Sequence, residues 1–129
     1  MARERKWRWI QDGIDAPGAA DQIRLYDGYP GRMEETLQSQ PWLTGESFTM
    51  ADIALAPYLN RLDALSMQGM WKNGRYPRVE DWFDRLRARR SFVPALRDWV
   101  PRELEAEMAR NGRNTWPAIS RMLQIPAAG

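Results

Sequence analysis

The residue types that are missing from this 129-residue sequence limit the reactions it could catalyse more than the residue types that are present. It has no Cys and no His, which excludes a thiolate nucleophile, an imidazole base, a disulfide and the usual zinc or non-haem iron sites. Carboxylate, lysine and tyrosine side chains remain, but the acidic residues show no clustered spacing that would hold a hard cation. The isolated glycines Gly28, Gly31 and Gly45 form no phosphate-binding loop. We therefore predict no catalytic, cofactor-binding or metal-binding residue in this chain.

The most specific pair of polar residues, Thr49 and Asp52, predicts the start of a helix. With Thr49 as the N-cap, its hydroxyl accepts a hydrogen bond from the backbone N–H of Asp52, and the Asp52 carboxylate accepts one from the N–H of Thr49. The carboxylate also suits the positive end of a helix. We assign both residues to folding, and a cap of this kind contributes roughly 1 kcal/mol, up to about 2.

The segment after this cap is unusually apolar and predicts a central buried helix over 49–66. Its apolar residues leave little room for a solvated face, which is typical of a helix packed on several sides. Pro57 lies within the pattern, where it removes one main-chain hydrogen bond and should bend the helix. The alternative is a helix that starts later or stops at Pro57. The apolar spacing, which continues unbroken to Leu65, favours one bent helix.

Two linked motifs give the sequence a family resemblance over roughly residues 20–97. The first, WLTGESFTMADIAL from Trp42 to Leu55, resembles the helix-capping signature of the all-helical C-terminal domain of glutathione S-transferases. The second, YPRVEDWFDRLRARRSF from Tyr76 to Phe92, is similar to the proline-started helix with a tryptophan and the Arg-x-Ser-Phe that follow in that family. The tail resembles bacterial, β-etherase-like members more loosely. Because both motifs are structural in the family, the resemblance implies the fold more strongly than the chemistry.

The first segment, residues 2–12, predicts a short helix that carries Trp7 and Trp9 among basic residues. Such a pattern also occurs on faces that bind nucleic acid or a membrane surface. We favour the alternative in which the tryptophans pack on the core and the charges are solvated.

The other segments predict an all-α bundle of about six helices, since none shows the period-2 alternation of a strand. Residues 19–40 should form a helix that is kinked or divided at 28–31, whereas the family usually has one unbroken helix there. A third helix starts at Pro77, and a short turn follows Ser91. A helix from Pro101 should end at 111–112, before a last piece over 116–123.

The resemblance implies a single domain over 1–129, with a helical tail over 98–129 and without the first, cleft-lining helix of the family. In the family, a separate thioredoxin-like N-terminal domain binds glutathione and activates its thiol, and this chain has no room for it. The helical domain supplies a wall of the electrophile pocket and part of the dimer contact. We therefore predict that the isolated chain is inactive and binds no cofactor, and that glutathione is used by a full-length relative.

Three aromatic residues are the candidates for a surviving substrate pocket. Tyr58 and Trp71 lie on or near the central helix, and Trp116 lies in the tail, which closes the pocket in many relatives. For each, plain core packing is the favoured alternative to ligand contact.

Two other classes of function stay open. Similar helical domains in translation elongation factor subunits and aminoacyl-tRNA synthetases dock other proteins, so the chain is also a candidate interaction module. An uncovered apolar face would favour a homodimer or a protein partner in either case. A nucleic-acid binder is less favoured, because the charges are mixed along the chain in spite of the pI near 9.3. The sequence has no run of apolar residues that would span a membrane and no secretory signal, so we expect the cytoplasm.

Overall fold

The computed structural model, which describes residues 2–126, is built of helices joined by short loops. Within these residues the α-helices are α1 (Ala2–Asp12), α2 (Ala19–Leu37), α3 (Met50–Ala64), α4 (Pro77–Arg87) and α5 (Arg102–Leu123). Two 3-10 turns, η1 (Gly13–Asp15) and η2 (Gln68–Met70), and a π-helical turn, η3 (Val93–Arg97), complete the chain. The same residues contain no strand, only an isolated bridge between Trp42 and Gly45. The predicted all-α fold is therefore confirmed.

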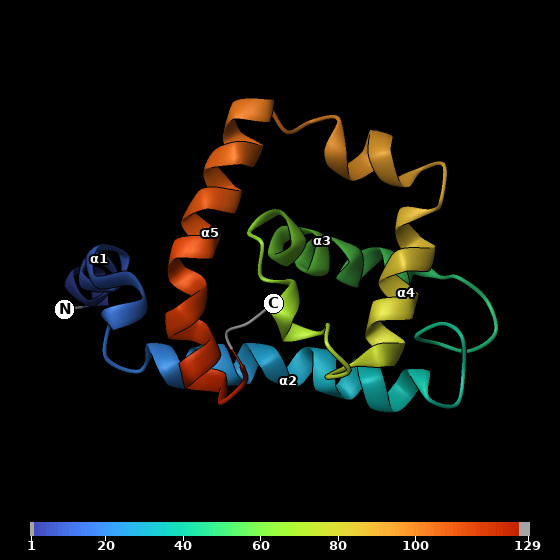
Figure 1. Ribbon diagram of the computed structural model, residues 1–129, viewed down its shortest axis with the longest axis horizontal. Helices are drawn as coiled ribbons and strands as arrows, with labels where there is room; N and C mark the ends of the chain where they lie inside the picture. Colours follow the sequence, from blue (N-terminus) through green and yellow to red (C-terminus); the bar gives the residue numbers. More distant parts are fainter. Residues whose placement is uncertain (1, 127–129) are drawn as a thin grey trace.

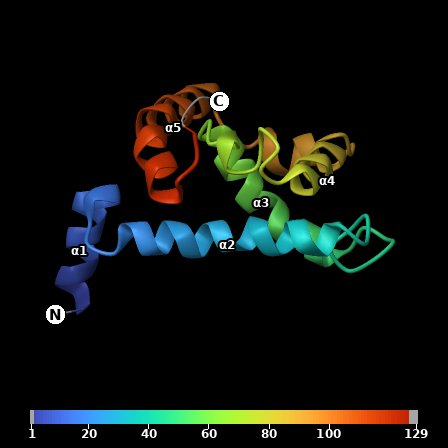
Figure 2. The same cartoon turned by 60° about the horizontal axis from the view of Figure 1, so that its bottom comes forward.

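The helices α2, α4 and α5 surround α3, which crosses the middle of the fold (Figure 1). α2 packs against both α4 and α5, and α1 stands apart at the beginning of α2 (Figure 2). The most deeply buried large side chains lie between α3 and α4 and in the loop that joins them: Trp71, Val79, Trp82 and Phe83. α2 and α3 are the two helices that form the site described below.

The central helix α3 runs through Pro57 without a break, as the apolar spacing predicted. Its buried side chains are those of Asp52, Ala56, Leu59 and Leu62. Two of its apolar side chains, Ile53 and Tyr58, remain 48% and 55% exposed. α3 is therefore packed on several sides, as predicted, but not all round: α4 and α5 contact it, and Tyr58 lies against Tyr26 of α2.

α2 is one unbroken helix across 28–31, so the expected kink or division there is wrong. Pro30 is buried, together with Met33 and Leu37, on the face that meets the rest of the fold. The phenol of Tyr76 approaches the backbone at Gly31, where there is no side chain to exclude it. Burial of this face outweighs the low intrinsic helix propensity of the glycines and the proline.

α5 is also one helix, so the predicted end at 111–112 is wrong. Gly112 is buried inside it, and a Cβ at this position would collide with the backbone carbonyl of Leu65 at the end of α3. The glycine therefore permits a close approach of two elements and does not stop the helix. Most of the predicted tail, 98–129, is this helix, which packs against α2 and α3; residues 127–129 lie outside the described part.

α1 does not bury its tryptophans, so the prediction that they pack on the core is wrong. Trp7 and Trp9 are 60% and 50% exposed, and Ile10 is 71% exposed. α1 contacts mainly η1, and the chain between α1 and α2 contains Gly18 with a φ of +82°. This turn directs α1 away from the body of the fold (Figure 2).

Candidate functional site

Asp52 is a buried hydrogen-bond centre that holds the front of α3 in place. Its Oδ2 accepts a hydrogen bond from the backbone N–H of Thr49 at 3.0 Å, and both halves of the predicted capping box are present. Its Oδ1 accepts from the backbone N–H of Leu43 at 3.1 Å and from the indole N–H of Trp82 at 2.8 Å. The carboxylate is fully buried. Because three donors already satisfy it, Asp52 is suited to a structural role.

Two polar contacts attach α2 to the segment that begins α4. The Arg75 guanidinium donates to both carboxylate oxygens of Asp27 at 2.6 Å, and this bond raises the pKa of Arg75. Two turns further along α2, Glu34 Oε2 accepts hydrogen bonds from the backbone N–H groups of Arg78 and Val79, at 2.9 Å each. A carboxylate at a helix start satisfies free N–H groups and favours the positive end of the helix. These contacts position α2 as one wall of a cavity.

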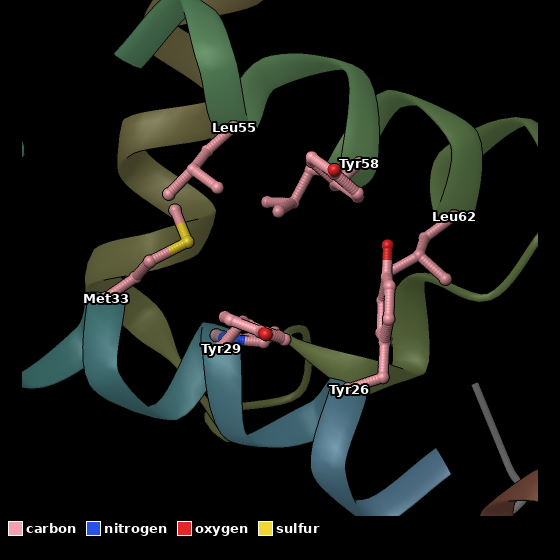
Figure 3. Close-up of a pocket in the computed structure, with 8 residues that line it drawn as sticks. Tyr26, Tyr29, Met33, Leu55, Tyr58 and Leu62 are labelled. Atoms are coloured by element: carbon pink, nitrogen blue, oxygen red, sulfur yellow. The ribbon is translucent and has the colours of Figure 1, made fainter. Parts of the chain in front are cut away.

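This cavity lies between α2 and α3 and has a volume of about 350 Å³. α2 and α3 contribute apolar and aromatic side chains from facing sides (Figure 3). The lining residues are Tyr26, Tyr29, Pro30, Met33, Leu55, Tyr58, Leu59 and Leu62. A concave site with an apolar lining and a few polar atoms is typical of sites for small apolar molecules.

The polar atoms of this lining are phenol hydroxyls. The ring of Tyr26 lies edge-on to that of Tyr29 and tilted against that of Tyr58, with centroids 6.3 Å apart in each pair. Burial raises the pKa of Tyr26, the nearby Tyr58 adds to this rise, and Arg61 opposes it. Tyr26 therefore keeps its proton at neutral pH and can offer a hydrogen bond to a ligand, but it is not a phenolate nucleophile.

The structure does not bring the three aromatic candidates together. Tyr58 lines the α2–α3 cavity. Trp71 is 1% exposed and packs edge-on against Phe83 in the core, with ring centroids 5.7 Å apart. Trp116 is 8% exposed and lies against the backbone at Gly69. The two tryptophans are therefore core residues, and neither lines the α2–α3 cavity.

Sequence reasoning missed Tyr26 and Tyr29, although a signal for them was present. Tyr26, Tyr29, Pro30 and Met33 follow the i, i+3, i+4, i+7 spacing of one helical face. A break at 28–31 would divide this pattern between two helices, so the sequence did not predict one continuous face.

Residues 2–126 offer neither a metal site nor a membrane span. Nowhere in that range do three acidic side chains gather in a group that could hold a metal ion. None of its helices combines the length and apolar character that a membrane span requires.

Comparison with known protein families identifies the family of this fold. The family model of the glutathione S-transferase C-terminal domain matches residues 15–85. This match covers more than half of the chain and includes α2, α3 and all but the last two residues of α4. The chain therefore belongs to the glutathione S-transferase C-terminal domain family.

Similar curated proteins are longer than this chain. It is 45% identical over 60 residues to a 2,5-dichlorohydroquinone reductive dechlorinase of Sphingobium indicum, a match that covers 46% of this chain and 17% of that protein. It is 36% identical over 69 residues to the disulfide-bond oxidoreductase YfcG of Escherichia coli, covering 50% and 28%. It is 31% identical over 81 residues to the FtsZ-localized protein A of Caulobacter vibrioides, covering 63% and 33%. The chain thus spans a third or less of each of these relatives, and no solved structure matches it.

Proposed function

We propose that this chain is the helical part of a glutathione transferase family protein, that it forms a wall of the electrophile pocket, and that it does not catalyse by itself. The observation that carries the proposal is the tyrosine-lined cavity between α2 and α3. Thiol activation requires glutathione held beside a donor that lowers the pKa of its thiol, and in the family the thioredoxin-like N-terminal domain supplies both. Glutathione therefore belongs to a thioredoxin-like domain of the full-length protein.

The lining of the cavity favours a small, flat aromatic molecule as the ligand. Aromatic rings pack edge-on or offset against such a molecule, and the neutral Tyr26 hydroxyl can hydrogen-bond to a substituent. One similar protein is a dechlorinase of 2,5-dichlorohydroquinone, which is a molecule of this kind. We assign a halogenated or hydroxylated benzene ring to the α2–α3 cavity.

Binding can be tested by titrating the isotope-labelled chain with 2,5-dichlorohydroquinone and following its NMR spectrum. We expect saturable shifts that are confined to the lining residues and are weakened by Tyr26→Ala. The matched control is Trp99→Ala, since Trp99 is 81% exposed and outside the lining. Shifts spread over the whole surface, or equal binding by the two variants, would refute the assignment.

Activity is tested separately. The pure chain should conjugate no glutathione to a chlorodinitrobenzene substrate, and it should show no saturable shifts with glutathione alone. Conjugation above the uncatalysed rate would refute the proposal that the chain is not catalytic by itself.

A protein-interaction module is the second candidate function, favoured by the exposed apolar side chains of α1 and by Trp99. Under either function we propose a homodimer or a protein partner, which ultracentrifugation and specific pull-down would detect.

The basic residues around Trp7 and Trp9 keep nucleic acid as a weaker alternative, for which binding should weaken steeply with salt. A cysteine-free chain needs no oxidising compartment, and we propose that it acts in the cytoplasm, which cell fractionation would test.

A further inference from the structure

The first surface that points to a further property is the apolar side of α1. Trp7 and Ile10 are three residues apart and therefore share one face of the helix. They are 60% and 71% exposed, and α1 contacts mainly η1. A helix of 11 residues with so little support is marginal in water. This face therefore lacks a packing partner in the described arrangement.

The second surface is the mouth of the α2–α3 cavity. Tyr29 on α2 is 49% exposed, and Tyr58 on α3 is 55% exposed. Leu25 stands beside this mouth, one turn before Tyr29, and is 60% exposed. The mouth is thus an apolar groove between two helices that no described element covers.

The chain between these two surfaces is short and can turn. It comprises residues 13–18, and Gly13 and Gly18 both have positive φ, at +54° and +82°. Neither glycine has a neighbouring group in the space where a side chain would be. Glycine adopts positive and negative φ at similar cost, so the chain can change direction at these two residues.

The dimensions allow α1 to return along α2. An 11-residue helix is about 16 Å long, and the first 11 residues of α2, up to Tyr29, span about the same length. If α1 ran antiparallel to α2, its own Trp7 would lie near the level of Tyr26. The apolar face of α1 would then lie over the mouth of the groove.

We propose that α1 is a mobile lid that folds back over the α2–α3 groove and covers it with Trp7 and Ile10. The structure describes the open arrangement. We infer that α1 covers the groove of its own chain and not that of a second copy, because the short tether raises the effective concentration of α1 there to about the millimolar range. The proposal concerns the ligand-free chain and does not depend on the function proposed above.

A photo-crosslinker placed on α1 tests the lid without assuming its register. We would replace Ile10 by p-benzoylphenylalanine, illuminate the ligand-free chain and identify the crosslinked peptides by mass spectrometry. Crosslinks should fall on the lining segments of α2 and α3 at the end of the groove that lies nearer the start of α2, around Tyr26 and Leu62 (Figure 3). The control places the same group at Arg8, on the opposite side of α1, where we expect groove crosslinks to be largely lost.

Mixing isotope-labelled and unlabelled chains decides whose groove is occupied. Crosslinks within one chain support the lid, whereas crosslinks between labelled and unlabelled chains would overturn it in favour of an exchanged dimer. A folded chain that gives no groove crosslinks from position 10 would also overturn it. Tyr58→Glu introduces a charge at a half-exposed position, where folding should survive, and it should abolish the crosslinks. Their persistence in that variant would show that α1 does not enter the groove.

Discussion

The indole N–H of Trp82 donates a hydrogen bond to Oδ1 of Asp52 at 2.8 Å, across 30 positions of the sequence. Asp52 belongs to the capping motif of α3, and Trp82 belongs to the proline-started helix α4. This bond is therefore a direct physical link between the two motifs that carry the family resemblance. The Asp52 carboxylate also accepts a hydrogen bond from the backbone N–H of Leu43, in the loop before α3.

Loss of the indole donor should destabilise the chain. Trp82→Phe keeps a large apolar ring but leaves the buried Asp52 with one donor fewer, and hydrogen bonds to charged groups contribute about 1.5–3 kcal/mol. We expect a fall of that size in the free energy of unfolding, measured by denaturant titration. Trp7→Phe, at an exposed position, is the control and should change the free energy of unfolding little.

Asp52→Ala should lower the free energy of unfolding more than Trp82→Phe does, and an unchanged melting temperature would contradict the role of the cap.

The ion pair between Asp27 and Arg75 should be a second point of weakness. Their side chains are only 13% and 20% exposed, so Arg75→Met leaves a largely buried carboxylate without its partner. We expect a loss of about 2–4 kcal/mol, somewhat below the cost for a fully buried pair. Thermal unfolding measures this. The control is Arg24→Met, which removes the exposed pair with Asp21 and should cost less than about 1 kcal/mol.

Two glycines in helices should respond oppositely to alanine. Gly112→Ala forces a Cβ against the Leu65 carbonyl, and overpacking of this kind costs about 1–3 kcal/mol. Gly28→Ala adds a methyl group where nothing lies within 4 Å, so the better helix propensity should stabilise α2 by up to about 1 kcal/mol. Melting temperatures of the two variants test this contrast. A stabilised Gly112→Ala chain would contradict the close contact between α5 and the end of α3.

High pH should destabilise the chain through Tyr26. Burial raises its pKa in the folded chain above the usual value of 10.0, so the folded state binds more protons than the unfolded state once the pH passes that value. The stability is therefore fully present below about pH 10 and falls as the pH rises toward the folded pKa. Denaturant unfolding at increasing pH measures the decline. Tyr26→Phe removes this group and should give a shallower decline; an equally steep one would assign it to other residues.

Several features of this protein could be predicted because their cause lies within a few neighbouring residues. The capping box joins residues three positions apart, and the continuity of α3 through Pro57 follows from an apolar pattern in one segment. The same local reasoning failed at 28–31 and at Gly112. Residues 28–31 lie in an intact helix because Pro30 and Met33 are buried against the rest of the fold. Gly112 allows a close contact with Leu65, which lies in another part of the sequence.

By itself, the sequence determined the helical class, the cap of α3, the family motifs and the exclusion of thiol and imidazole chemistry. These depend on residue types and on spacings within one turn or one helix. The tertiary structure decided that Trp71 and Trp116 belong to the core and that Tyr26, Tyr29 and Tyr58 share a cavity. It also left the tryptophans of α1 exposed. Burial depends on which faces of distant helices meet, and the periodicity of a single helix shows that it has an apolar face without showing what covers it.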